Sequence, residues 1–280
     1  MSLHRTFLGT VVVAWTSCLG LIVAAAPLEA QVLDSGPVHE DGCDRPSGPP
    51  NSSPTLSKAG PVIMARYFGV TEDYGHGVLG DALEAKGLLV RYDNGDRVIC
   101  DTVLAGADRV FEDTSPRLAD LNGDGVNEVV AVASHQSLGA RLEVYGYPGP
   151  GQDFQLQSHT AYIGKAYRWL APVGVADVNG DGQKDIAYVQ TPHLGKQLKI
   201  VTPRDDKLVE IAAASGFSNH RIGEAFISGG IRDCGDGPEI ILADKNWRRL
   251  VAVRMEASKL LSRDLGELRS QESFKTALAC

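Results

Sequence analysis

A nine-residue segment rich in oxygen-bearing side chains occurs twice in the chain, at 120–128 (DLNGDGVNE) and at 177–185 (DVNGDGQKD). Each copy has side-chain oxygens at positions 1, 3, 5 and 9 and a glycine for the sharp turn at position 6. Carboxylate, amide and carbonyl oxygens at this spacing are typical ligands of a Ca²⁺ loop. Because neither copy contains His or Cys, the pattern favours a hard cation such as Ca²⁺ over Zn²⁺.

We therefore expect two Ca²⁺ sites. The expected ligands of the first are Asp120, Asn122, Asp124, Glu128 and the main-chain carbonyl of Val126. Those of the second are Asp177, Asn179, Asp181, Asp185 and the main-chain carbonyl of Gln183. The alternative is a pair of metal-free turns, because Asn-Gly and Asp-Gly favour hairpin turns by themselves. Two copies in the same register, each ending in a carboxylate, favour the metal.

Strand-like sequence flanks both loops, at 116–119 and 129–132 and at 173–176 and 186–189. In an EF-hand the last carboxylate stands at position 12 of a loop between two helices. Here it stands at position 9 between strands. The loops are therefore predicted to be the tips of β-hairpins.

The second loop begins 57 residues after the first, at 177 against 120, and the similarity continues beyond the loops. Further short apolar segments follow at 143–145 and 154–157, and again at 199–201 and 208–212. Four short antiparallel strands per repeat are typical of a β-propeller blade. No amphipathic helix of any length is predicted, so the fold class is all-β.

A third repeat is predicted over 227–265 with a decayed metal loop. If Arg168 is aligned with Arg221, Gly230 replaces Asp177 and Arg232 replaces Asn179. Two ligands are then lost, and a guanidinium takes the place of the cation. The alternative is a distorted site that keeps the acids at 233, 236 and 239.

Upstream, strands are expected at 62–70, 77–81, 88–91 and 97–100. The tail 274–280 is a further strand candidate, and either this tail or the segment 62–70 is expected to close the ring by pairing with the other terminus, because closure removes exposed sheet edges. The predicted architecture is a β-propeller of four or five four-stranded antiparallel blades.

The block at 171–187 resembles the FG-GAP and VCBS-type repeats of calcium-binding β-propellers, which are related to the blades of integrin α-chain heads. The resemblance is strong over about 113–205 and weaker over 70–112 and 221–280. It implies Ca²⁺ bound within a blade by the two loops and not by the third repeat. Such propellers often have more blades than this chain can supply, which leaves the ring size open.

Residues 1–30 are expected to be an export signal, because His4 and Arg5 precede an apolar run from Phe7 to Ala26. Cleavage is expected after Ala30 rather than after Ala26, and an uncleaved membrane anchor is the alternative. Residues 31–60, rich in Pro, Gly and Ser, are expected to be a flexible leader. Residues 61–280 then form the propeller of a secreted or periplasmic protein, with no membrane span after cleavage.

Charge and cysteine content limit the partners and the compartment. A formal net charge of −8 offers no basic footprint for nucleic acid. Signal cleavage leaves Cys43, Cys100, Cys234 and Cys280, which allow two disulfides in three pairings. We favour a Cys234–Cys280 bond that fastens the last repeat, and free buried thiols are the alternative.

Arginines recur where the chain enters the first strand of each repeat. Arg168 with Trp169, Arg221 and, more loosely, Arg109 are expected at the mouth of the propeller channel. They are predicted to accept an anionic ligand such as an acidic sugar or a carboxylate of a partner. The alternative is that each arginine pairs with a nearby acid of its own chain, such as Asp113 or Glu224.

The sequence contains no nucleophile elbow, P-loop, dinucleotide fingerprint or metalloprotease helix. The recurring His135 and His193 are expected to be solvent-loop residues. We therefore predict an exported, non-catalytic module with two structural Ca²⁺ ions that binds a protein or a glycan. The alternative is a polysaccharide lyase or hydrolase with its site at the channel mouth.

Overall fold

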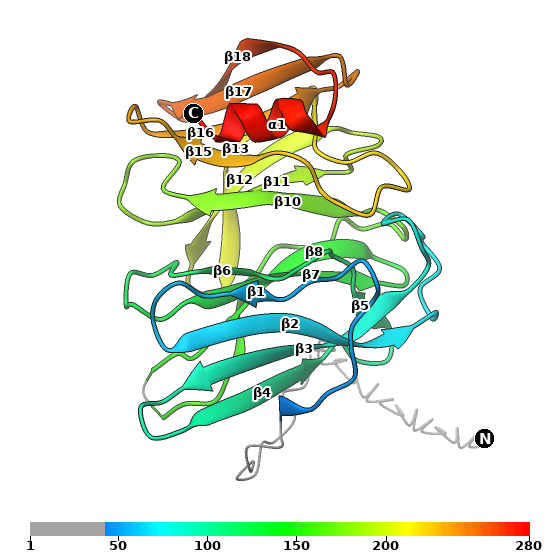
Figure 1. Cartoon of the computed structure of the whole chain (residues 1–280), viewed down its shortest axis with the longest axis vertical. Coiled ribbons are helices and arrows are strands. Elements are labelled where there is room, and N and C mark those ends of the chain that lie inside the picture. The colour runs from blue at the N-terminus through cyan, green and yellow to red at the C-terminus, as the bar shows by residue number, and fades with distance from the viewer. Residues whose placement is uncertain (1–42, 150) are drawn as a thin grey trace, which may run out of the picture.

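The computed structural model describes residues 43–149 and 151–280 (Figure 1). The expected export signal at 1–30 and the first part of the leader lie outside the described residues. In the described part of the chain, no helix is long and apolar enough to cross a membrane.

The described chain is all-β with one short helix at its C-terminal side, and its strands fall into four groups along the sequence. The first group contains β1 (Thr55–Leu56), β2 (Val62–Thr71), β3 (Glu84–Asp93) and β4 (Val98–Leu104). The second contains β5 (Arg109–Phe111), β6 (Arg117–Ala119), β7 (Glu128–His135), β8 (Gly139–Gly146) and β9 (Gln155–His159). The third contains β10 (Leu170–Ala176), β11 (Asp185–Gln190), β12 (Gln197–Arg204) and β13 (Lys207–Ser215). The fourth contains β14 (Phe217–Ser218), β15 (Gly230–Asp233), β16 (Pro238–Asp244), β17 (Arg249–Glu256) and β18 (Lys259–Glu267), and it is followed by α1 (Gln271–Leu278).

Strands within a group pair antiparallel with their neighbours. The first and second groups are joined by one pairing, Ala85 with Phe111, and the second and third by one parallel pairing, His159 with Lys207. The fourth group is a separate five-stranded sheet. Figure 1 shows the groups stacked in chain order, from blue and cyan to orange and red. This is a β-propeller-like arrangement.

Apolar cores lie between successive groups. One contains Leu88 and Phe111, the next contains Leu142 and Leu170, and the third lies between the third and fourth groups. The inner groups therefore bury both faces of their sheets. This explains why β7 and β11 read as nearly continuous apolar runs rather than as alternating strands.

The outer face of the first group is covered by residues that were expected to form a flexible leader. Cys43 is bonded to Cys100 on β4, and Ser47 pairs with Phe68 on β2. Cys43 packs against the small apolar cluster that contains Leu89. The structure thus places residues 43–60 against the first sheet, because a disulfide and backbone pairing hold them there.

The outer face of the fourth group is covered by α1, and the prediction of a strand at 274–280 is wrong. Ser270 caps the helix and forms a capping box with Ser273, which favours a helix start at this point. Phe274 is buried in a cluster with Ile241 and Leu250. The expected Cys234–Cys280 disulfide is confirmed and fastens the end of this cover.

The strand expected at 77–81 is also wrong, because these residues lie in the connection between β2 and β3. Gly77 and Gly80 have φ of 62° and 95°, which interrupts an extended conformation. Val78 and Leu79 are buried in the core between the second and third groups. The connection also reaches the fourth group, since the amide of Gly223 donates to the carbonyl of Val78 at 3.1 Å.

The two ends of the strands carry different connections. The hairpin tips at 120–127, 177–184, 205–206 and 233–237 lie at one end, here called the acidic end. The segments 72–83, 160–169, 191–196, 216–229 and 245–248 lie at the other, here called the mouth end.

Candidate functional site

The two nine-residue loops have the same geometry at their tips. The carboxylate of Asp120 accepts from the amides at positions 4 and 6, at 2.7 and 3.0 Å, and that of Asp177 does so at 2.7 and 2.9 Å. The glycines that provide these amides have φ between 78° and 89°. Such a backbone favours glycine and directs both amides toward the first carboxylate.

Positions 3 and 5 face each other in both loops. Asn122 and Asn179 accept from the amide of position 5, at 2.9 and 2.8 Å. Asp124 and Asp181 accept from the amide of position 7, at 2.7 and 2.8 Å. The oxygens of positions 1, 3 and 5 are thereby held around the same turn.

The carboxylate at position 9 is buried below each tip. Glu128 accepts from the amide of Leu121 at 2.7 Å, and Asp185 accepts from the amide of Val178 at 3.0 Å. Burial raises the pKa of Glu128 to about 7 and raises the pKa of Asp185. Oδ1 of Asp185 is buried without a hydrogen-bond partner. The nearby hydroxyl of Thr202 lowers the Asp185 pKa but does not satisfy hydrogen-bond geometry with this oxygen.

This donor set fits a hard cation in chemistry. A buried carboxylate oxygen without a partner costs free energy, and a bound cation would compensate that cost. Among the described residues, no group of three or more His, Cys, Asp or Glu side chains is arranged to hold a metal. A Ca²⁺ ion here would therefore need the Asn oxygens and the main-chain carbonyls as well as the carboxylates, as Ca²⁺ loops commonly do.

The strand register corrects the alignment of the third repeat. Glu128 pairs with Ala119, Asp185 with Ala176, and Glu239 with Arg232. Asp233, which follows Arg232, is thus the counterpart of the first loop residue, and not Gly230. The third loop runs from 233 to 239 and is two residues shorter than the others.

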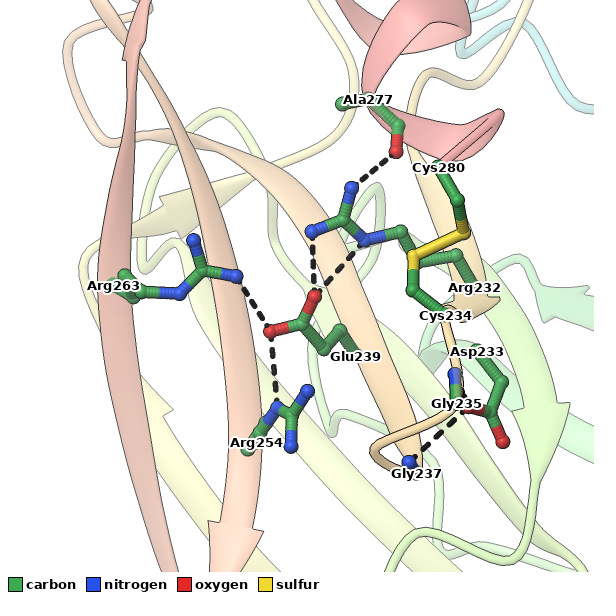
Figure 2. The surroundings of a disulfide bond; sticks show 10 residues. All are labelled: Arg232, Asp233, Cys234, Gly235, Gly237, Glu239, Arg254, Arg263, Ala277 and Cys280. Carbon is green, nitrogen blue, oxygen red and sulfur yellow. Dashed lines mark hydrogen bonds and ion pairs between the residues drawn. A yellow bond between two sulfur atoms is a disulfide. The ribbon is translucent and has the colours of Figure 1, made fainter.

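In this shortened loop, guanidinium groups surround the carboxylate that corresponds to position 9 (Figure 2). Arg232 donates to one oxygen of Glu239 at 2.9 and 2.5 Å, and Arg254 and Arg263 donate to the other at 3.0 and 2.9 Å. Burial raises the pKa of Glu239, but these hydrogen bonds outweigh burial and lower it to about 2. The alignment that placed Arg232 at position 3 of the loop is therefore wrong, and its guanidinium lies beside the acid that corresponds to position 9.

At the mouth end, two of the three predicted arginines are paired within the chain. Arg109 is buried and donates to Glu143 at 2.8 Å. Arg221 is exposed, lies 4.3 Å from the centre of the Trp247 ring and is 3.8 Å from Glu224. Among the described residues Arg168 has no ion-pair partner. Arg168 is half-buried, whereas Arg221 is exposed.

Trp169 is buried, so its ring is not a surface platform. Its Nε1 donates to the carbonyl of Glu112 at 2.8 Å and links the third group to the second. Its ring lies 5.0 Å from that of His220 and 6.3 Å from that of His193. Trp169 therefore supports the mouth end from below.

Two residues that the sequence did not single out form a polar pair at the mouth end. Nδ1 of His76 lies 2.5 Å from Oε1 of the buried Glu112, whose other oxygen accepts from the hydroxyl of Ser134. The half-exposed Tyr167 ring lies 5.5 Å from the His76 ring. Burial and the nearby Glu112 raise the pKa of Glu84 to about 10. The loop between β2 and β3 brings His76 here, and no local sequence pattern marks it.

The recurring histidines have different surroundings. His193 Nε2 lies 2.8 Å from His220 Nδ1, and His220 Nε2 lies 2.9 Å from the carbonyl of Glu224. Because that carbonyl only accepts, His220 carries its proton on Nε2 and accepts from His193. His135 instead interacts with its own turn through Ser137. His193 is thus part of a contact between groups rather than a free loop residue.

Comparison with protein families agrees with this geometry. Residues 106–188 match the family described as an FG-GAP-like repeat. This segment is similar to an FG-GAP-like repeat. The matched FG-GAP-like segment includes the second strand group, β10 and both nine-residue loops, and it ends before the third loop. No curated protein sequence matches the chain. The predicted resemblance is therefore confirmed for the segment that carries the loops.

Proposed function

We propose that this protein is an exported, non-catalytic β-propeller module with two Ca²⁺ loops that binds a protein or a glycan. The observation that carries the proposal is the pair of matching loops, each with a buried carboxylate at position 9. The two disulfides support an oxidising compartment, where such bonds persist.

We also propose that the four strand groups are four blades. Three groups repeat the same antiparallel order, and each buries an apolar core against the next. The contact of Gly223 with Val78 brings the connections of the first and fourth groups together. Among the described residues, no strand of the first group pairs with a strand of the fourth. Closure is therefore proposed through loops rather than through a shared sheet.

Each Ca²⁺ would be held by the side chains at positions 1, 3, 5 and 9 and the carbonyl at position 7. In the first loop these are Asp120, Asn122, Asp124, Glu128 and the Val126 carbonyl, and in the second Asp177, Asn179, Asp181, Asp185 and the Gln183 carbonyl. A bound cation neutralises carboxylates that the fold crowds together. Because the ligands come together only in the folded chain, binding stabilises it.

The test is thermal unfolding with Ca²⁺ and with chelator. At about a hundredfold excess of Ca²⁺ over Kd, each site should add about 3 kcal/mol to the free energy of unfolding. Asp124→Ala and Asp181→Ala should each remove part of the calcium-dependent rise in melting temperature. Asp236→Ala, in the shortened third loop, is the matched control and should leave the rise intact. A melting temperature that does not respond to Ca²⁺ would rule out occupied loops.

A polysaccharide lyase or hydrolase is the second candidate. It is favoured by the His76–Glu112 pair beside the exposed ring of Tyr167, since an oriented imidazole is a common acid–base group. Incubation with polygalacturonate and alginate, followed by measurement of new reducing ends, tests this candidate. Product formation that His76→Ala abolishes would establish the enzyme. If no product forms, the non-catalytic binding module is favoured.

A further inference from the structure

We propose that the mouth end docks an acidic polypeptide segment that also carries apolar side chains. This inference rests on the proposed binding function and specifies the face and the partner. It starts from the distribution of charge between the two ends. In the four tips that define the acidic end, acids outnumber cations: Asp120, Asp124, Asp177, Asp181, Asp205, Asp206, Asp233 and Asp236 against Lys184.

The mouth-end connections at 160–169, 191–196, 216–229 and 245–248 have the opposite balance, whereas the first-group connection at 72–83 carries Glu72, Asp73 and Asp81. The cations of the former four connections are Lys165, Arg168, Lys196, Arg221, Lys245 and Arg248, and their acid is Glu224. Glu224 is already paired with Arg221. In the described chain, the other five cations form no ion pair. An anionic partner therefore meets positive charge without first having to break internal pairs.

These connections, together with the β7–β8 turn that contains Leu138, carry exposed apolar side chains. Leu194 and Ile222 are 63% and 73% exposed, and Tyr167, Phe226 and Leu138 are 50%, 43% and 40% exposed. These five are most of the large apolar side chains that the described structure exposes. Apolar groups gathered on one face of a soluble protein indicate an interaction surface.

Contacts between the connections make this a continuous surface. The amide of Gly164 donates to the carbonyl of Leu138 at 2.8 Å, which places the second-group turn against the segment that contains Tyr167. The His193–His220 contact joins the segments that contain Leu194 and Ile222. Next to them, Lys196 Nζ donates to the carbonyl of Lys245 at 2.6 Å.

The composition of this surface favours a polypeptide over a glycan. Leu138, Leu194 and Ile222 are aliphatic, and Leu194 and Ile222 are the two most exposed of the five. Tyr167 and Phe226 are about half-exposed rings, Trp247 is half-buried beside Arg221, and Trp169 is buried. Sugars are commonly recognised by stacking on exposed rings, whereas aliphatic side chains suit apolar side chains of a peptide. The whole chain carries −8, so an acidic partner is attracted to this end and repelled elsewhere, which orients docking.

The experiment uses three fluorescein-labelled peptides of equal length and measures anisotropy. One alternates Glu with Leu and Phe, the second has Ser in place of Leu and Phe, and the third has Lys in place of Glu. The first should bind, and its affinity should fall as NaCl is raised. The second and third peptides should bind at least tenfold more weakly, because the second lacks apolar side chains and the third lacks acidic ones.

Two variants of the protein locate the binding face. Arg168→Glu with Lys196→Glu, and separately Leu194→Ser with Ile222→Ser, should each weaken binding of the first peptide at least tenfold. Lys207→Glu is the matched control, because it reverses an exposed cation directly after the 205–206 tip, away from the mouth end. An unchanged melting temperature shows that each variant is folded, since the altered side chains are partly or largely exposed.

Three outcomes overturn the inference: no binding of the first peptide, equal binding of the Ser peptide, or an equal loss with Lys207→Glu. Oligogalacturonate that binds and is lost with Arg168→Glu would keep the binding module but make its partner a glycan. Salt-sensitive self-association that the same variant abolishes would make the partner the acidic end of a second copy. A missing calcium response with intact peptide binding would reject only the calcium loops.

Discussion

Arg232 lies directly opposite Glu239 in the β15–β16 pair, at the register position that Ala176 and Asp185 share in the β10–β11 pair. The first two loops place a buried carboxylate below an oxygen-rich tip. The third loop has a buried carboxylate as well, Glu239, and the guanidinium of Arg232 lies beside it. The Cys234–Cys280 bond fastens the same short loop to the segment after α1. In the fourth group, guanidinium groups therefore neutralise the charge of the buried acid.

Arg232→Ala should destabilise the protein by about 2 kcal/mol, in Ca²⁺ and in chelator alike. It leaves the buried Glu239 short of a partner, although Arg254 and Arg263 still donate to it. Arg249→Ala is the matched control, because its pair with Asp264 is about half exposed and surface pairs contribute little to stability. Urea unfolding measures both variants. Equal losses of stability in the two variants would show that burial of Glu239 does not strengthen the contribution of its ion pairs to the free energy of unfolding.

Asp185→Asn should have opposite effects with and without calcium. In chelator the change removes a buried negative charge whose Oδ1 has no partner, so the free energy of unfolding should stay level or rise by about 1 kcal/mol. In Ca²⁺ the change removes a ligand, so most of the gain from the second site should disappear. Melting curves of the wild type and the variant, each recorded in chelator and in Ca²⁺, show whether the substitution raises or lowers stability in each condition. A loss of equal size in both conditions would contradict this interpretation of the loop.

The two disulfides should protect opposite parts of the molecule. Replacing Cys234 and Cys280 by Ser should cost about 2–4 kcal/mol and increase hydrogen exchange in α1 and β16. Replacing Cys43 and Cys100 should cost a similar amount but increase exchange in β2 and β4. Each variant is the control for the other in hydrogen-exchange mass spectrometry. Increased exchange in the same segments in both variants would show that the covers do not act locally.

The contact between His193 and His220 should make the protein less stable in acid. Burial and the neighbouring His220 lower the pKa of His193 to about 4, and burial lowers the pKa of His220. Between about pH 6.5 and about pH 4, the two histidines are protonated in the unfolded chain but remain neutral in the folded protein. The free energy of unfolding therefore falls as the pH drops from about 6.5 toward about 4. Allowing for its partial exposure, we expect a loss of about 1–2 kcal/mol.

His193→Asn should flatten this part of the pH profile, measured by urea unfolding between pH 7.5 and pH 4.5. His159→Asn is the control, because His159 lies next to the carbonyl of its neighbour Thr160 and not next to a second imidazole. Equal flattening in both variants would place the acid sensitivity elsewhere.

The part of the fold that repeats was predictable from sequence, because the ligand-type residues and the glycines mark the same turn twice. The third loop was misaligned for a physical reason. Arg168 stands two residues before β10, whereas Arg221 stands nine before β15, so the shared arginines do not share a register. In the fourth group the connection before β15 is longer, and the loop at 233–239 is shorter, than in the third group. The strand pairing is what reveals both differences.

The features that were missed depend on contacts between distant segments. Helix α1 buries mainly Phe274, so it lacks the apolar periodicity that predicts a helix. His76 meets Glu112 across 36 positions, and Arg109 meets Glu143 across 34. No local spacing encodes such pairs. The acidic tips, by contrast, carry their whole pattern within nine residues.

The two covers, one held through Cys43 and the other through Cys280, also limit how this architecture can lengthen. A new repeat added outside either cover would meet a surface already shielded by peptide and would find no bare sheet to stack on. A duplicated repeat inserted between the second and third groups would meet a bare apolar face on each side. Growth by internal duplication is therefore compatible with this molecule, whereas a repeat stacked on either outer sheet would have to displace its cover.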